Sequence, residues 1–141
     1  MLRCVLDTDV IIAALRSPGG ASAAILSAAL ERQVTLLGSV PLALEYEAKC
    51  LEFRHYDEAG LDQERAGIFA SGVIALLEPV YMDFHWRPQL IDPADEMVLE
   101  TAINGQADLL VTFNLRDYGD APCRFGIEAI RPAQAIWRIR T

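Results

Sequence analysis

The sequence predicts an α/β fold in which helices cover both faces of a central parallel sheet. Short apolar runs, typical of buried strands, alternate along the chain with longer segments of helical periodicity. This alternation favours a parallel sheet, because each parallel connection needs a crossover long enough to hold a helix. The chain has 141 residues, of which 52% are hydrophobic. That is enough for one core and too little for two ordinary domains, so we expect a single domain over residues 1–141.

The first third of the chain predicts a strand followed by two helices. Arg3–Leu6 is a short apolar run that ends at the polar triplet Asp7-Thr8-Asp9. A helix is expected from Val10 to Leu15, where Ser17-Pro18-Gly19-Gly20 interrupts it. The alanine-rich segment Ala21–Glu31 predicts the second helix, because alanine has the highest helix propensity.

The next elements are a second strand and a capped helix. Val34–Leu37 reads as a buried strand closed by Gly38. Ser39 is expected to cap the following helix, with Pro41 in its first turn. Four side chains fall on one face of this helix and predict its buried side: Leu42, Tyr46, Cys50 and Phe53.

The second half of the chain continues the same alternation. A more polar helix is expected over Asp62–Leu76, and Pro79–Leu90 is expected to be irregular. Asp92-Pro93-Ala94-Asp95 opens a helix whose apolar face includes Met97, Val98, Thr101 and Ala102. The remaining expected elements are a strand at Leu109–Thr112, one helical turn at Leu115–Tyr118, an edge strand at Ile127–Ile130 and a closing helix at Pro132–Arg138.

Composition excludes several classes of protein. The balance of 20 acidic to 12 basic residues gives a net charge of -8, the wrong sign for a broad basic surface that binds nucleic acid. No apolar run is long enough to span a membrane and the N-terminus lacks the pattern of a signal peptide, so a soluble cytoplasmic protein is expected. Three cysteines without paired spacing argue against a disulfide framework or a zinc site, and Cys4 and Cys50 read as core residues.

Acidic residues follow the first strand and border the buried face of the third helix. Asp7 and Asp9 lie at the carboxyl end of the first strand, where ligands bind to parallel sheets. The structural alternative is that Asp7 only caps the next helix. Glu45 lies about a quarter turn from the centre of the apolar stripe, so its side chain can point along the sheet edge or serve a structural role.

Helix-start chemistry is a competing explanation for the later acids. Asp92 and Asp95 fit the N-cap and third position of a capping box, and Asn114 with Asp117 repeats that spacing. Capping does not explain why Asp7, Asn114 and Asp117 all follow strands that end at one edge of the sheet. We therefore expect these acids to converge.

Four segments together resemble the PIN-domain family, which includes the VapC-like toxins of toxin–antitoxin systems. The segments, in the family's order, are Val5–Ile11, Pro41–Tyr46, Asp95–Ala102 and Ala107–Tyr118. The last is the most specific match. Two positions depart from the family pattern: Asp9 stands where Asn is usual, and Asn114 stands where many members carry Asp.

The resemblance implies a three-layer α/β/α sandwich and a ribonuclease that depends on Mg²⁺ or Mn²⁺. The implied metal ligands are Asp7, Glu45, Asp95 and Asp117, and Asn114 joins them in the catalytic set. Oxygen ligands of this kind suit hard divalent ions rather than zinc. The family also implies an RNA substrate, an antitoxin protein partner and a homodimer.

Substrate contacts are expected from side chains close in sequence to these motifs. Arg16 and Arg116 are candidates for holding the RNA, with a solvated surface charge as the alternative for each, and Thr112 in the fourth motif completes the predicted substrate-binding set. Trp86 and Trp137 are expected to pack in the core or a dimer interface, with base stacking as the alternative.

Two other functions compete with the nuclease. An apolar strand followed by Asp-x-Asp also begins the haloacid-dehalogenase-like phosphatases, which need a downstream lysine near the phosphate. Lys49, the sole lysine, lies in a helix near Glu45 and fits that role poorly. The non-enzymatic alternative is an inactive PIN-like domain that binds nucleic acid or another protein.

Overall fold

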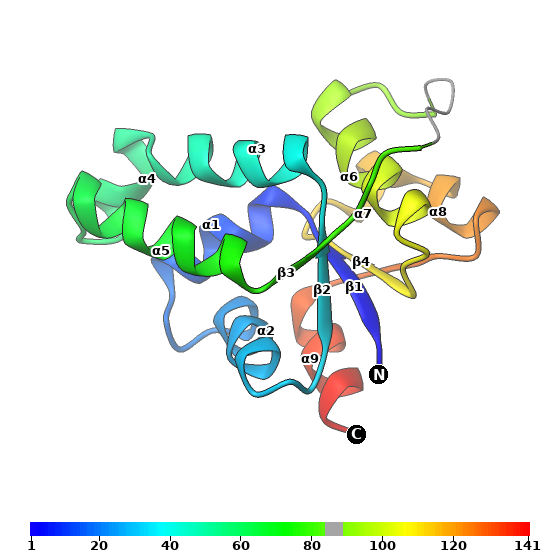
Figure 1. Cartoon of the computed structure of the whole chain (residues 1–141), viewed down its shortest axis with the longest axis horizontal. Helices are drawn as coiled ribbons and strands as arrows, with labels where there is room; N and C mark the ends of the chain where they lie inside the picture. The colour runs from blue at the N-terminus through cyan, green and yellow to red at the C-terminus, as the bar shows by residue number, and fades with distance from the viewer. Residues whose placement is uncertain (84–88) are drawn as a thin grey trace.

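A computed structural model describes residues 1–83 and 89–141. Within them, five strands form one sheet in which every neighbouring pair is parallel, in the order β3-β2-β1-β4-β5 (Figure 1). The strands are β1 (Arg3–Leu6), β2 (Thr35–Gly38), β3 (Leu77–Pro79), β4 (Leu109–Val111) and β5 (Glu128–Ile130). The predicted parallel sheet is thus confirmed, as is the edge position of the last strand.

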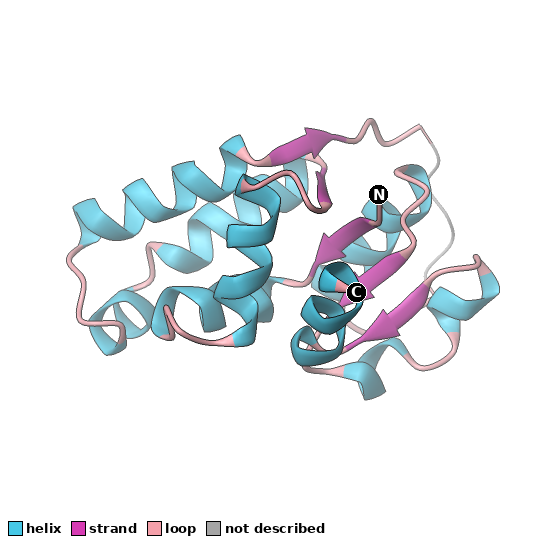
Figure 2. Cartoon of the chain, turned by 90° about the horizontal axis from the view of Figure 1, so that it is seen from below, coloured by secondary structure: helices cyan, strands magenta, loops and turns pink. Residues whose placement is uncertain are grey.

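Helices cover both faces of this sheet (Figure 2). They are α1 (Thr8–Arg16), α2 (Ala21–Leu30), α3 (Val40–Cys50), α4 (Phe53–Glu58), α5 (Gln63–Ala75), α6 (Pro93–Asn104), α7 (Leu115–Tyr118), α8 (Ala121–Arg124) and α9 (Pro132–Arg140). Helix α6 packs on β1, β2 and β4, whereas α9 packs on β4 and against α2. The arrangement is the three-layer α/β/α sandwich that the resemblance implied.

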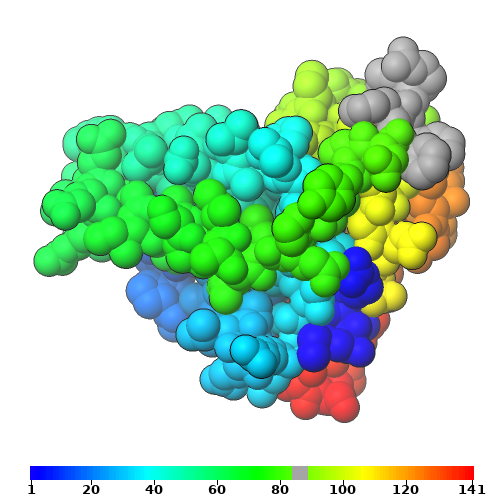
Figure 3. Space-filling model, viewed as in Figure 1, coloured from blue at the N-terminus to red at the C-terminus, as the bar shows by residue number. Residues whose placement is uncertain are grey.

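Helices α3, α4 and α5 extend to one side of the sheet as an arm (Figure 3). Helix α3 packs against α1, α5 and α6, so the arm is joined to the sheet through α1 and α6. In the described part of the chain, no single helix is long and apolar enough to cross a membrane. The pair α1 and α2 reaches that length and composition only together, with a bend of 98° between them.

The strand order reverses between β1 and β4. From β1 the chain moves through β2 to β3 at one edge, and then returns by way of α6 to β4 on the other side of β1. The carboxyl ends of β1 and β4 lie side by side, where the Asp7 backbone N–H donates to the Val111 carbonyl at 2.9 Å. Ligands of open α/β sheets bind at such a switch point, because the two following connections diverge to opposite faces and leave a crevice.

The third helix ends earlier than its apolar stripe predicts. Leu42, Tyr46 and Cys50 are fully buried, as expected, but α3 stops at Cys50 and Phe53 begins a separate helix, α4. Phe53 is 65% exposed and stacks edge-on against Tyr56, with ring centroids 5.5 Å apart. The break falls at Glu52, whose backbone is extended although no glycine or proline marks it.

Two short elements were absent from the sequence prediction. Helix α8 is a single turn, and β3 lies at the sheet edge just before the segment expected to be irregular, of which residues 84–88 lie outside the described structure. Strand β3 pairs with β2, and the Leu77 side chain packs over Gly38, where an added Cβ would lie 2.4 Å from Leu77 Cδ1. A three-residue strand that is stabilised by pairing with its neighbour has too few residues of its own to be predicted from the sequence.

Candidate active site

Asp7 is held at the end of β1 by two elements at once. The strand ends in the core and α1 begins at Thr8, so Asp7 takes the N-cap position and is only 7% exposed. Its Oδ1 accepts a hydrogen bond from the Thr8 backbone at 2.7 Å, and its Oδ2 accepts one from Thr112 Oγ1 at 2.8 Å. Burial raises the pKa of Asp7 above its usual value, and these hydrogen bonds oppose the rise.

Asp9, in the first turn of α1, faces the loop that follows β4. Its Oδ2 accepts hydrogen bonds from the Phe113 backbone at 3.1 Å, from Asn114 Nδ2 at 3.0 Å and from Thr112 Oγ1 at 3.4 Å. Its Oδ1 is buried with no partner among the described residues. Burial, and then the charge of Asp7, raises the pKa of Asp9 to about 7. The sequence analysis noted Asp9 at the strand end but left it out of the predicted ligands, although the Asp-x-Asp spacing was the available signal.

Asp95 and Asp117 approach Asp7 from two other helices, α6 and α7. Asp95 lies in the first turn of α6, where burial and the charges of Asp7, Asp92 and Asp117 raise its pKa to about 6. Asp117 is exposed on α7 and also acts on the pKa of Asp7. Asp92 caps α6 as predicted, with Oδ1 accepting from the Ala94 backbone at 2.9 Å. Asp7, Asp95 and Asp117 are therefore within electrostatic reach of one another.

Tyr118 places a buried hydroxyl beside these acids. Its side chain is 1% exposed, and its hydroxyl makes no hydrogen bond of ordinary length and angle among the described residues, but it interacts with the carboxylates of Asp7 and Asp95 and lowers their pKa values. Burial, and then the nearby charges of Asp7 and Asp95, raises the pKa of Tyr118. The sequence analysis did not single out this residue, although it directly follows Asp117 in the fourth motif.

Glu45 shares a cavity with Asp7 and Asp9. The Glu45 side chain is 26% exposed, as expected for the border of the buried face of α3, and its Oε1 lies 4.0 Å from Lys49 Nζ. The cavity has a volume of about 790 Å³. It is lined by Asp7, Thr8, Asp9, Ile12, Ala13, Arg16, Ser17, Glu45, Lys49, Arg54, His55, Asp92, Ala94 and Phe113.

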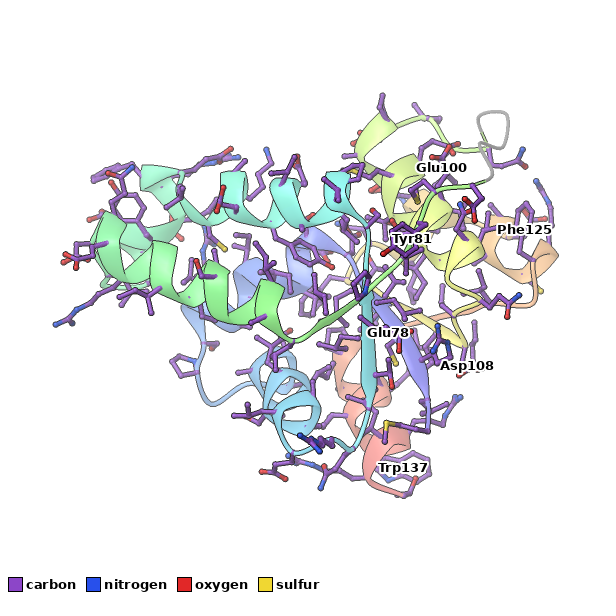
Figure 4. All side chains as sticks on the ribbon, viewed as in Figure 1. Glu78, Tyr81, Glu100, Asp108, Phe125 and Trp137 are labelled. Atoms are coloured by element: carbon purple, nitrogen blue, oxygen red, sulfur yellow. The ribbon has the colours of Figure 1, made fainter. Side chains whose placement is uncertain are left out.

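The predicted substrate contacts occupy different surroundings. Arg16 lines the cavity, whereas Arg116 is exposed on α7 and is not among the described residues that line it. Thr112 is fully buried, with its hydroxyl bonded to Asp7, so it faces the acids rather than open solvent. Trp137 is 66% exposed, so it does not occupy the predicted core position. Figure 4 shows it on α9, on the side of the molecule away from α6. Trp86 lies outside the described residues.

Asn114 does not cap α7 in the way its spacing predicts. It occupies the N-cap position, but its side chain makes no capping hydrogen bond. Its amide donates to Asp9 Oδ2 instead, and its own backbone N–H donates to Thr112 Oγ1 at 2.9 Å. A cap would use the Asn114 side-chain oxygen as an acceptor, and the bond donated by Nδ2 to the Asp9 carboxylate instead fixes the orientation of this side chain.

The donor chemistry fits a hard divalent cation. In the described ranges, no three Asp, Glu, His or Cys side chains are already arranged as a complete ligand set. The carboxylates present nevertheless repel one another, and Asp9 Oδ1 is a buried oxygen without a partner. Mg²⁺ binds through one or two carboxylates and keeps several waters, so it does not require a closed protein cage. Asp7, Asp9 and Glu45 lie on the lining of one cavity, and Asp95 and Asp117 interact electrostatically with Asp7.

Comparison with known proteins identifies the family and supports the fold. The PIN domain profile matches residues 3–116. A chain in the crystal structure of VapBC2 from Rickettsia felis, bound to a DNA fragment from the promoter, aligns with a TM-score of 0.63 and 14% identity. The alignment covers 92% of this chain and 98% of that one. A sequence comparison with curated proteins finds no match. The profile spans most of the sequence, and the chain therefore belongs to the PIN-domain family.

Proposed function

We propose that this protein is an endoribonuclease that depends on Mg²⁺ or Mn²⁺ and hydrolyses RNA phosphodiester bonds. The observation that carries the proposal is the electrostatic coupling of four acids near the switch point of the sheet: burial and neighbouring charges, that of Asp117 among them, raise the pKa values of Asp7, Asp9 and Asp95. PIN domains are generally nucleases, which gives the same function independent support. Family membership also disfavours the phosphatase alternative, whose required lysine is held here by Glu45 and Glu52.

Carboxylates with raised pKa values are suited to bind a cation, because the cation stabilises their charged form. In the proposal Asp7, Asp9 and Asp95 hold it directly or through water, and Asp117 and Glu45 complete the negative surround. When bound, such an ion lowers the pKa of a coordinated water and neutralises charge on the scissile phosphate. Without it the acids would repel the phosphate backbone, so we expect catalysis to require added metal.

The remaining polar groups position these acids. Thr112 orients Asp7, and Asn114 orients Asp9 through its amide. We accordingly replace the predicted substrate contact of Thr112 with this positioning role, because its buried hydroxyl already serves Asp7. Arg16, on the wall of the cavity, keeps its proposed role in holding RNA.

The proposal extends to a protein partner. The similar structure from Rickettsia felis is that of VapBC2 on promoter DNA, so it is described as part of an assembly. We propose by analogy that this chain is a toxin component bound by an antitoxin, and that it forms a homodimer. Co-expression with the product of an adjacent gene, followed by size-exclusion chromatography with light scattering, tests both points.

Cleavage assays on single-stranded and structured RNA test the central proposal. The wild type is expected to cut in Mn²⁺ and to lose activity in EDTA. Asp7→Asn should reduce cleavage by at least about 100-fold, because charge stabilisation at a reacting centre is commonly worth that much. The matched control is Asp108→Asn, an exposed aspartate before β4 at the opposite end of the sheet, which should cleave like the wild type.

Equal cleavage by the wild type and Asp7→Asn would reject the assignment. RNA binding without cleavage by a folded, Mn²⁺-supplemented wild type would favour the inactive PIN-like alternative.

A further inference from the structure

Three cationic side chains gather on one wall of the cavity that holds the acids. These are Arg16, Lys49 and Arg54, which we name the cation wall, and all three line the same cavity as Asp7 and Asp9. The chain has a net charge of -8 and a single lysine, yet that lysine lies here. Three helices contribute because α1 packs against both α3 and α4, and Figure 1 shows α3 leading into α4 at the end of the arm that lies away from the sheet.

Arg16 is fixed from two sides. Its Nη1 lies 3.0 Å from Glu58 Oε2, and its Nη2 lies 2.8 Å from His55 Nδ1. A guanidinium can only donate, so His55 Nδ1 is the acceptor and the ring proton is on Nε2, which lies 3.4 Å from Glu52 Oε2. Burial and the charges of Arg16 and Arg54 lower the pKa of His55, in keeping with a neutral ring.

Lys49 and Arg54 are oriented by one shared carboxylate. Glu52 Oε1 lies 3.2 Å from Lys49 Nζ, and Glu52 Oε2 lies 2.8 Å from Arg54 Nε. The described lining of the cavity includes the three cations but neither Glu52 nor Glu58. Each of these glutamates thus orients cations from outside the lining, and Glu45 is the acid that shares the wall with Lys49.

We propose that the cation wall is a subsite for a phosphate of the RNA backbone that flanks the scissile phosphate. This deepens the proposed function and rests on it. The acids attract a phosphate only with a cation present, whereas Arg16, Lys49 and Arg54 attract one directly, through the electrostatic contact that dominates nucleic-acid affinity. Arginine also presents a planar fork that matches phosphate oxygens. A cavity of about 790 Å³ has the volume of a site for a drug-sized ligand, which is more than a single phosphate needs.

Binding of uncleaved RNA isolates this subsite from catalysis. In an Asp7→Asn background, the dissociation constant of a fluorescent single-stranded RNA is measured by anisotropy over a series of salt concentrations. Arg54→Gln should weaken binding by about 3- to 10-fold and reduce the slope of log K against log salt by about 0.7, the value for one phosphate contact on a single strand. Lys49→Gln should act in the same direction. Arg140→Gln, an equal charge change at the exposed end of α9, should do neither.

A second series of RNAs locates the phosphate that is bound. One linkage at a time is replaced by an uncharged methylphosphonate. At one position the replacement should weaken binding to the Asp7→Asn protein, but not to the Asp7→Asn protein that also carries Arg54→Gln. Circular dichroism melting confirms that each variant is folded.

The proposal is overturned if Arg54→Gln and Lys49→Gln both match Arg140→Gln in affinity and salt slope. It is also overturned if no single linkage shows the dependence on Arg54. A wild type that never cleaves RNA, but whose RNA affinity depends on Arg54 as described, would contradict the nuclease proposal and leave the phosphate subsite in place.

Discussion

Thr112 Oγ1 donates a hydrogen bond of 2.8 Å to Asp7 Oδ2, although 105 residues separate the two in the chain. The bond joins the residue after β4 to the residue after β1, at the point where the strand order reverses. A buried carboxylate needs such a partner, because an unsatisfied one costs several kcal/mol. The sheet topology therefore positions Asp7, and Thr112 stabilises its charged form.

Thr112→Val should destabilise the protein in a pH-dependent way. Valine keeps the volume and removes the donor, so about 1–3 kcal/mol of unfolding free energy should be lost at pH values where Asp7 is charged. Thr112 lowers the pKa of Asp7. The loss should therefore shrink as pH falls and Asp7 becomes protonated. Urea denaturation at pH 7.5 and pH 5 measures this. Thr101→Val, which removes a hydroxyl bonded to the Met97 carbonyl and Ser39, should show no such pH dependence.

The metal-free protein should become less stable as pH rises through the acidic range. Asp9 has a pKa of about 7 in the folded protein and Asp95 one of about 6, both above the usual aspartate pKa of 3.8. Acids with raised pKa values bind more protons when folded, so the folded state is favoured below about pH 4 and this advantage is lost as pH rises toward 7. Other titrating groups also contribute to the pH dependence of the unfolding free energy. The wild type is therefore compared with Asp9→Asn, which removes the contribution of Asp9.

Asp9→Asn should reduce the loss of unfolding free energy with rising pH by on the order of 1–2 kcal/mol, a figure that includes solvent screening of Asp9. Mn²⁺ should raise the melting temperature of the wild type more at pH 7.5 than at pH 5.5, because protons compete for the same oxygens. Thermal melts in EDTA and in Mn²⁺ measure both effects. Parallel wild-type and Asp9→Asn curves in EDTA would contradict the raised pKa of Asp9.

Removing the hydroxyl from each of two buried tyrosines should have opposite effects on the free energy of unfolding. Tyr118→Phe removes a buried hydroxyl that makes no hydrogen bond of ordinary length and angle, so the metal-free protein should keep its stability or gain up to about 1 kcal/mol. Tyr46→Phe removes the hydrogen bond that Tyr46 donates to the Leu6 carbonyl, and should cost about 1–2 kcal/mol. Both side chains are 1% exposed or less, which makes them a matched pair. Chemical denaturation in EDTA distinguishes them, and an equal loss in both would show that Tyr118 has a partner in solution.

Asn114→Asp should make folding depend on metal. The change replaces the amide that donates to Asp9 with a second carboxylate, so like charges would face each other 3.0 Å apart. In EDTA at pH 7.5 the melting temperature should fall, with a cost of about 1–3 kcal/mol. Mn²⁺ should restore most of it. Asn104→Asp, on α6, serves as the control and should show no comparable recovery with Mn²⁺.

The strands that could be predicted are those whose own side chains carry the signal. Arg3–Leu6 was predicted at the bounds that the structure shows, because a short apolar run followed by Asp7 marks both the strand and its end. Strand β3 is visible only through its pairing with β2. The break before Phe53 was missed because an apolar residue at helical spacing looks the same whether the helix continues or restarts.

The acids of the site could be chosen from the sequence, but their partners could not. Asp7, Asp95 and Asp117 were selected by strand ends and motif order, and the fold brings them within reach of one another. The roles of Asn114 and Tyr118 depend on contacts across the switch point, which sequence spacing does not encode. The capping role that spacing offered as an alternative for Asn114 does not occur, because its amide donates to Asp9.

By itself the sequence determined the alternation of strands and helices, the acidic character of the chain and the positions of the acids at strand ends, since periodicity and local propensity are properties of neighbouring residues. Only the tertiary structure decided that β4 lies beside β1, that Asp9 is bonded by the loop after β4, and that Arg16, Lys49 and Arg54 share one wall. Those arrangements arise from contacts between distant segments, whose free energy is gained only when the whole core closes.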